Sequence, residues 1–229
     1  MSSILRRVRD GFKVRAACRQ IRRHGFWFVD IPRTSSSSIR AELTSHFGNV
    51  HGKLKLFEEE YAAESVFPGH QPARKMRHVL GDSAWRDIFT FTVVRNPWDR
   101  AVSLFAYRRR VGDIPGEWTF REYVRRLAEA DSTTEGFKYY GYRWGASDFI
   151  VDDDGQIIVD YVARFETRSD DLKVIGGRIG LDRLGDLAIQ GTSQGLHYGQ
   201  SYDSETADVI RNLYRRDIEL FGYEFEPEP

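Results

Sequence analysis

Residues 26–47, with the sequence FWFVDIPRTSSSSIRAELTSHF, contain an apolar run, a short polar loop and a helical pattern in direct succession. The first six residues are mostly apolar and aromatic, which predicts a buried strand. Ile39, Leu43 and Phe47 then fall on one face of a helix, and Gly48 is a typical residue for its end. A buried strand, a tight loop and an amphipathic helix in this order indicate an α/β fold.

The loop of this unit contains four consecutive serines, a pattern that elsewhere is typical of a flexible linker. Here the run is too short for a spacer and has the length of a tight strand-to-helix connection. Backbone N–H groups and the positive end of the helix meet in such a loop, which favours an anion such as phosphate. Arg33 adds a full positive charge. The hydroxyl donors of the loop are Thr34, Ser35, Ser36, Ser37 and Ser38. The alternative interpretation is that the serines only cap the helix.

Residues 88–110, IFTFTVVRNPWDRAVSLFAYRRR, form a second unit of the same kind. The first seven residues predict another buried strand, and Asn96 followed by Pro97 is a typical start of a helix. Arg95 therefore follows the strand, and Ser103 lies in the second helical turn. Ligands of open α/β folds lie beyond the carboxyl ends of the strands, so the two loops should offer two anion sites.

The chain length and composition set the domain organisation. With 229 residues, 41% of them hydrophobic, we predict a single domain over residues 1–229, with a basic helix at 1–24 and an α/β core at 25–229. The basic helix is interpreted as an ordinary solvated first helix, with membrane-surface or partner docking as the alternative. The zero net charge argues against a nucleic-acid partner, and no apolar stretch suits stable membrane insertion. The single cysteine, Cys18, excludes an internal disulfide and favours a cytoplasmic location.

Two further motifs predict local structure alone. Thr119 with Glu122 predicts a capping box at the start of a helix. The sequence DDDG at 152–155 lacks the spacing of a calcium loop and predicts a β-turn before a strand at 156–165.

The second unit resembles the V-R-N-P-W-D-R-x-V-S-x-Y segment of the PAPS-dependent sulfotransferases, in the branch that acts on carbohydrates. PAPS is 3′-phosphoadenosine 5′-phosphosulfate. This chain has VVRNPWDRAVSLFAY, with Arg95 and Ser103 at the family spacing, and its IPRTSSSS is similar to the family's I-P-K-T-G-G-T-S loop. DYVARFETRSDDL is similar to the family's R-F-E segment, and YDSETADVIRNLYRRDIELFGYEF is similar to its final helix. The resemblance spans residues 26–225.

This resemblance implies a P-loop-like, three-layer α/β domain whose central, mostly parallel sheet is flanked by helices. It implies that Arg33, Thr34 and the serines cradle the 5′-phosphosulfate of PAPS, while Arg95 and Ser103 bind its 3′-phosphate. No metal is required, because arginines and helix ends supply the positive charge. Beside this motif, Trp98 is a candidate for stacking on adenine.

The first loop departs from the family at three positions. Arg33 stands where the family usually has lysine, so the charge is kept and a planar fork is added. Ser35 and Ser36 stand where the family has two glycines, which permit a left-handed backbone and close approach to a ligand. The serine hydroxyls can compensate by donating directly to the anion.

The expected general base is His70, in FPGHQPARKMRHVLG between the two units. This stretch resembles the position of a catalytic histidine in the carbohydrate branch, and histidine is well suited to take a proton from an acceptor hydroxyl. The alternative is a solvated loop histidine. His78 is expected to be structural, and His197 and Tyr198 are second-rank site candidates in a polar, glycine-rich loop. The remaining histidines are expected at the surface: His24, His46 and His51.

These observations predict a sulfotransferase that moves a sulfuryl group from PAPS to a hydroxyl of a saccharide or glycan-like acceptor. One alternative is a homologue that binds PAPS or another anion without catalysis. Another is a sulfotransferase that acts on a small alcohol or phenol, although the G-x-x-G-x-x-K segment common in phenol and steroid enzymes is absent. A nucleotide kinase is disfavoured, since the chain lacks G-x-x-x-x-G-K-[ST].

Overall fold

The computed structural model of the protein describes residues 14–48, 70–130, 144–187 and 197–227. Its centre is a parallel sheet in which β2 lies between β1 and β3. The strands are β1 (Phe26–Val29), β2 (Phe89–Val94) and β3 (Tyr161–Arg164). This mixed α/β architecture, with helices on a parallel sheet, confirms the predicted fold class.

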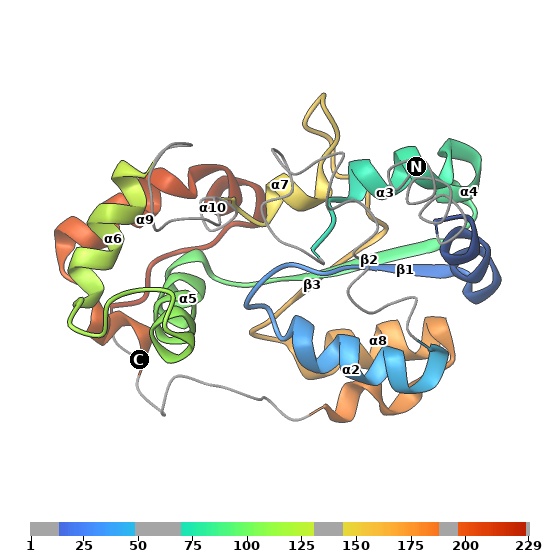
Figure 1. Cartoon of the computed structure of the whole chain (residues 1–229), viewed down its shortest axis with the longest axis horizontal. Helices are drawn as coiled ribbons and strands as arrows, with labels where there is room; N and C mark the ends of the chain where they lie inside the picture. The colour runs from blue at the N-terminus through green and yellow to red at the C-terminus, as the bar shows by residue number, and fades with distance from the viewer. Residues whose placement is uncertain (1–13, 49–69, 131–143, 188–196, 228–229) are drawn as a thin grey trace, which may run out of the picture.

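Side chains of the strands alternate between two cores, one on each face of the sheet. Phe26 and Phe28 lie in one core, and Trp27 and Val29 lie in the other. Two helices cover the first face, namely α2 (Ser36–Phe47) and α8 (Arg168–Ile179). The opposite face is covered by α3 (Ala73–Leu80), α4 (Asp82–Arg86) and α7 (Ser147–Ile150) (Figure 1). Helical residues 14–24 contribute Ala17 and Ile21 to this second core. Both faces are therefore buried, as is usual for a parallel sheet.

The other helices gather beyond the carboxyl ends of the strands (Figure 1). They are α5 (Pro97–Val111), α6 (Phe120–Glu129), α9 (Ser204–Leu213) and α10 (Arg215–Phe221), with the short helix η4 (Tyr198–Ser201). The short helix η3 (Asp182–Asp186) instead packs on α8. In the described parts of the chain, no helix is long and apolar enough to cross a membrane. The single domain over residues 1–229 stays a prediction, since it extends past the described residues.

Several predicted boundaries differ from the observed ones. The first strand ends at Val29 and not at Ile31, and the strand predicted at 156–165 is formed only at Tyr161–Arg164. Asp160 explains the late start, because its carboxylate accepts hydrogen bonds from N and Oγ1 of Thr90, both at 2.7 Å. The final helix is divided at Tyr214 into α9 and α10.

The two local motifs are confirmed. Thr119 and Glu122 form the capping box that begins α6. The DDDG sequence makes a turn in which Gly155 N donates to Asp152 O at 3.1 Å and Gly155 has φ 81°.

Candidate functional site

The serine loop joins β1 to α2 through a backbone with two left-handed residues. Arg33 and Ser35 both have φ 68°, a conformation that is uncommon for residues other than glycine. Ser35 is the N-cap of α2, yet its side chain does not cap the helix. The interpretation of the serines as simple helix caps is therefore wrong. A helix start without a side-chain cap leaves N–H groups that suit an anionic ligand.

The hydroxyls of the loop point in different directions. Thr34 is fully buried, and its Oγ1 donates to Ile31 O at 2.9 Å, so this hydroxyl holds the turn. Ser36 is also buried, whereas Ser37 is exposed and Ser35 is half-buried. The backbone and only part of the serine run can therefore face a ligand.

Asp30, the residue that follows β1, anchors a buried ionic cluster beneath this loop. It is 7% exposed, and its carboxylate forms an ion pair with Arg40 of α2. His70 Nδ1 lies 2.9 Å from both the backbone O and the carboxylate Oδ1 of Asp30. Burial raises the pKa of the Asp30 carboxyl, but His70 and Arg40 outweigh burial and hold the pKa below its ordinary value. The Asp30 carboxylate is therefore ionised in the folded protein at neutral pH.

This contact also fixes the orientation of the His70 ring. A carbonyl oxygen can only accept a hydrogen bond, so the nitrogen that contacts Asp30 O carries a proton. In the neutral ring the lone pair is then on Nε2, which is the nitrogen able to take a proton from another group.

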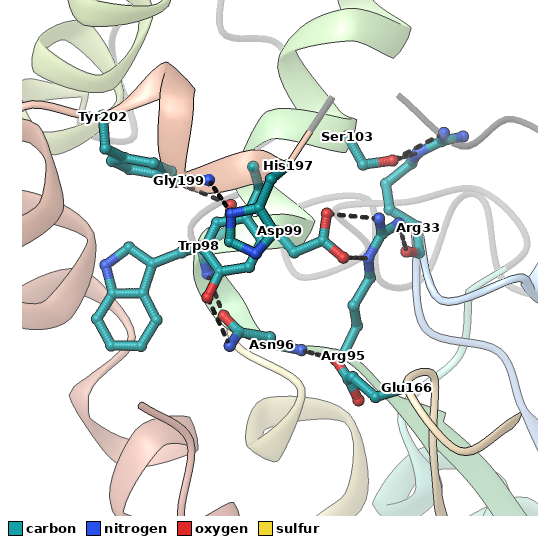
Figure 2. Close-up of polar contacts among 11 residues, drawn as sticks. Arg33, Arg95, Asn96, Trp98, Asp99, Ser103, Glu166, His197, Gly199 and Tyr202 are labelled. Carbon is teal, nitrogen blue, oxygen red and sulfur yellow. Dashed lines mark hydrogen bonds and ion pairs between the residues drawn. The ribbon is translucent and has the colours of Figure 1, made fainter. Parts of the chain in front are cut away.

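The second unit meets the first through its arginine and serine, as Figure 2 shows. Arg33 donates to Ser103 Oγ from Nε at 3.1 Å and from Nη2 at 3.0 Å. Arg95 donates from Nη1 to Arg33 O at 3.2 Å and forms a two-point ion pair with Asp99 at 2.8 and 2.7 Å. The sequence suggested two anion sites; the structure joins their residues in one continuous network.

A comparison of the chain with known protein families covers both of these units. A family profile described as "Sulfotransferase family" matches residues 19–224 of the chain. The chain belongs to this family. It is thus a PAPS-dependent sulfotransferase, as its motifs predict. No curated protein and no solved structure matches the chain.

The R-F-E segment of this sulfotransferase supports the start of α5. Asn96 caps α5 by accepting from Trp98 N, and its own N–H donates to Glu166 Oε1 at 2.7 Å (Figure 2). Glu166 Oε2 accepts a hydrogen bond from Tyr223 OH at 3.2 Å. The glutamate therefore fixes the turn that carries Arg95, a role that the sequence motif alone did not reveal.

Two of the predicted cofactor-binding residues, Trp98 and Tyr198, are buried. Trp98 is 1% exposed, and its Nε1 donates to Ala207 O at 2.9 Å, so its ring packs against α9. Tyr198 is 8% exposed, and its hydroxyl accepts hydrogen bonds from Asn96 Nδ2 and Glu226 N. These two aromatic side chains position α5 and the C-terminal segment.

The other histidines follow the predictions only in part. His78 is exposed in the last turn of α3, and its structural role stays a prediction. His197 Nδ1 accepts from Gly199 N at 3.2 Å and caps η4. His46 is exposed as expected, His24 is half-buried, and His51 lies outside the described residues.

Replacing Asp30 with asparagine tests the buried cluster. Breaking a buried ion pair by removing one partner is strongly destabilising, so D30N should lower the free energy of unfolding by about 3 kcal/mol at pH 7. The carboxyl has a lower pKa in the folded chain than in the unfolded chain. Its contribution is therefore complete above its unfolded pKa and is lost as the pH falls through the folded value. The difference between wild type and D30N should narrow below about pH 4 in urea unfolding series.

A matched control for this test is D82N, which removes a carboxylate from the exposed ion pair of Asp82 with Arg77. Exposed pairs contribute little, so this variant should unfold like the wild type at every pH. A stability of D30N equal to that of D82N would contradict the role given to the buried cluster.

Proposed function

We propose that this sulfotransferase transfers the sulfuryl group of PAPS to a hydroxyl of a saccharide or glycan-like acceptor, with His70 as the general base. The observation that carries the proposal is the contact of His70 Nδ1 with Asp30. Asp30 lies three residues before Arg33, so the contact holds the histidine beside the anion loop. The saccharide class is supported by the resemblance to the carbohydrate branch.

The proposed reaction is an in-line displacement at sulfur. The acceptor oxygen forms a bond to sulfur, and the bond from sulfur to the bridging oxygen of the 5′-phosphate breaks. The electron pair stays on that oxygen, and 3′-phosphoadenosine 5′-phosphate (PAP) leaves. His70 Nε2 takes the proton of the acceptor hydroxyl. Arg33 and the N–H groups at the start of α2 stabilise the charge that develops on the bridging oxygen.

The second unit is proposed to bind the 3′-phosphate of the donor. Arg95 is 6% exposed, and its pair with Asp99 sets the direction of its guanidinium. Ser103 Oγ, already within hydrogen-bond distance of Arg33, adds a donor from α5. Arg95 and Ser103 together give two-point recognition of a phosphate.

A second candidate function is binding of PAPS without catalysis. It is favoured by the left-handed backbone of Ser35 at a position where the family has glycine, since serine in this conformation is strained. Such a protein binds PAP but transfers sulfuryl to no acceptor. A screen of saccharides, small alcohols and phenols with PAPS separates the two functions and also tests the acceptor class.

Calorimetric titration with PAP, beside ATP and AMP, tests the proposal. The wild type should bind PAP with micromolar affinity and prefer it to both other nucleotides. R95A should weaken PAP binding by about 10–100-fold, the loss expected for one hydrogen bond to a charged group. Its affinity for adenosine 5′-phosphosulfate, which has no 3′-phosphate, should change little.

The control for this variant is R109A, which removes an exposed arginine from the same helix. It should bind all nucleotides like the wild type. Equal losses of PAP and adenosine 5′-phosphosulfate in R95A would contradict the 3′-phosphate role. A wild type that prefers ATP would overturn the proposed donor site.

A further inference from the structure

Arg168, the first residue of α8, is a buried cation that reaches the serine loop. It is 5% exposed, and its Nη1 donates to Ser35 Oγ while its Nη2 donates to Leu187 O at 2.9 Å. Its Nε is buried and has no hydrogen-bond partner in the ranges that the structure describes. A buried guanidinium with an unsatisfied donor is costly, so this position calls for a further acceptor.

Within the described ranges, the charge of Arg168 is not balanced by a neighbouring carboxylate. The two acidic residues in the first turn of α8 have other partners: Asp170 pairs with Lys173, and Asp171 accepts from Tyr161 OH. A cation at the positive end of a helix is unfavourable by itself, because the helix dipole repels it.

A second arginine, Arg95, lies close to Arg168, with its own charge paired to Asp99. Both guanidinium groups contact the ring of Phe165, with Arg95 Cζ 4.0 Å and Arg168 Cζ 5.6 Å from its centroid. Burial lowers the pKa of Arg168, and the charge of Arg95 lowers it further. The guanidinium of Arg168 and the N-terminus of α2 thus converge on Ser35.

We propose that Arg168 is a donor-binding residue, which holds the 5′-phosphosulfate end of PAPS together with the Ser35 hydroxyl and the N-terminus of α2. A tetrahedral anion has enough oxygens to accept from the guanidinium and from the loop at once. The identity of the anion rests on the proposed function; the need for an anion rests on the buried, unbalanced charge. Ser35 then has a use at a position where the family has glycine, since its hydroxyl links Arg168 to the loop.

The test compares R168Q with the wild type in calorimetric titrations of three nucleotides. Adenosine 5′-phosphate has only the 5′ group, adenosine 3′-phosphate has only the 3′ group, and PAP has both. R168Q should bind adenosine 5′-phosphate and PAP about 10–100-fold more weakly and adenosine 3′-phosphate like the wild type. The control R178Q removes an exposed arginine from the other end of α8 and should change none of the three.

Each other outcome has a distinct meaning. Wild-type affinities in R168Q, or equal losses for all three nucleotides, would overturn the 5′ role of Arg168 and leave the proposed function intact. A wild type that binds no nucleotide would overturn the proposed function. In that case the anion site is tested by comparing the Tm in inorganic sulfate with the Tm in chloride at equal ionic strength. A rise in the wild-type Tm that is absent in R168Q supports the site, and equal rises overturn it.

If R168Q does not fold, R168K replaces it, because lysine keeps the charge but loses the fork. R168K should bind adenosine 5′-phosphate and PAP about 3–10-fold more weakly, with adenosine 3′-phosphate unchanged. Unchanged affinity for all three nucleotides would overturn the proposal.

Discussion

Replacing Arg33 with alanine should lower kcat by about 10²–10³-fold, the loss typical of removing one donor that stabilises developing negative charge. The side chain leaves a left-handed residue of the anion loop, crosses to Ser103 and lies with its Cζ 4.9 Å from the ring centroid of Tyr107. This places its charge between the segments proposed for the two ends of the donor. The affinity for PAP should fall by only about tenfold, because Arg95 and the loop N–H groups remain. Initial rates of PAP release at saturating acceptor, with PAP titrations, measure both quantities.

Arg33→Lys is the matched control, because lysine is the residue that the family usually has at this position. It keeps the charge and loses the two-point contact with Ser103, so kcat should stay within about tenfold of the wild type. A kcat of R33A within about threefold of the wild type would show that Arg33 does not act on the reacting bond. A loss of PAP affinity as large as the loss of kcat would indicate a binding role instead.

Local sequence was sufficient to predict the elements that carry the site. The strand, loop and helix around the serine run follow from short-range periodicity, and the Asn96 cap follows from its place before Pro97. The position of Arg95 after β2 follows for the same reason, because strand and helix boundaries are set by neighbours in the chain.

Contacts between distant segments could not be predicted in this way. Trp98 stands in the nucleotide motif, but its ring packs against a segment 109 positions later in the chain, where Nε1 bonds Ala207 O. Arg168 reaches Ser35 across 133 positions, and no local pattern marks that contact. Asp30 gave a weak signal, since a carboxylate directly after an apolar strand needs a partner.

Replacing His70 with alanine should lower kcat by about 10²–10⁴-fold, the range that a positioned general base contributes. The nucleotide should still bind with nearly wild-type affinity, because the proposed phosphate contacts come from Arg95, Ser103 and the start of α2. Protonation of a histidine base lowers the rate at acid pH, and the residual rate of H70A should not show this decrease. Acceptor-dependent rates between pH 5 and pH 9, together with PAP titrations, measure these effects.

His78→Ala is the control, because His78 is an exposed histidine of α3, eight positions after His70. It should keep both the rate and the pH profile.

D30N adds an independent test of the orientation. The backbone oxygen of Asp30 still contacts Nδ1 in this variant, so the His70 ring keeps its direction and loses only the nearby carboxylate. We therefore expect D30N to lose less kcat than H70A, about tenfold, because an imidazolium next to a carboxylate is stabilised as the proton is taken. Turnover of H70A with an unchanged pH profile would mean that another residue is the base.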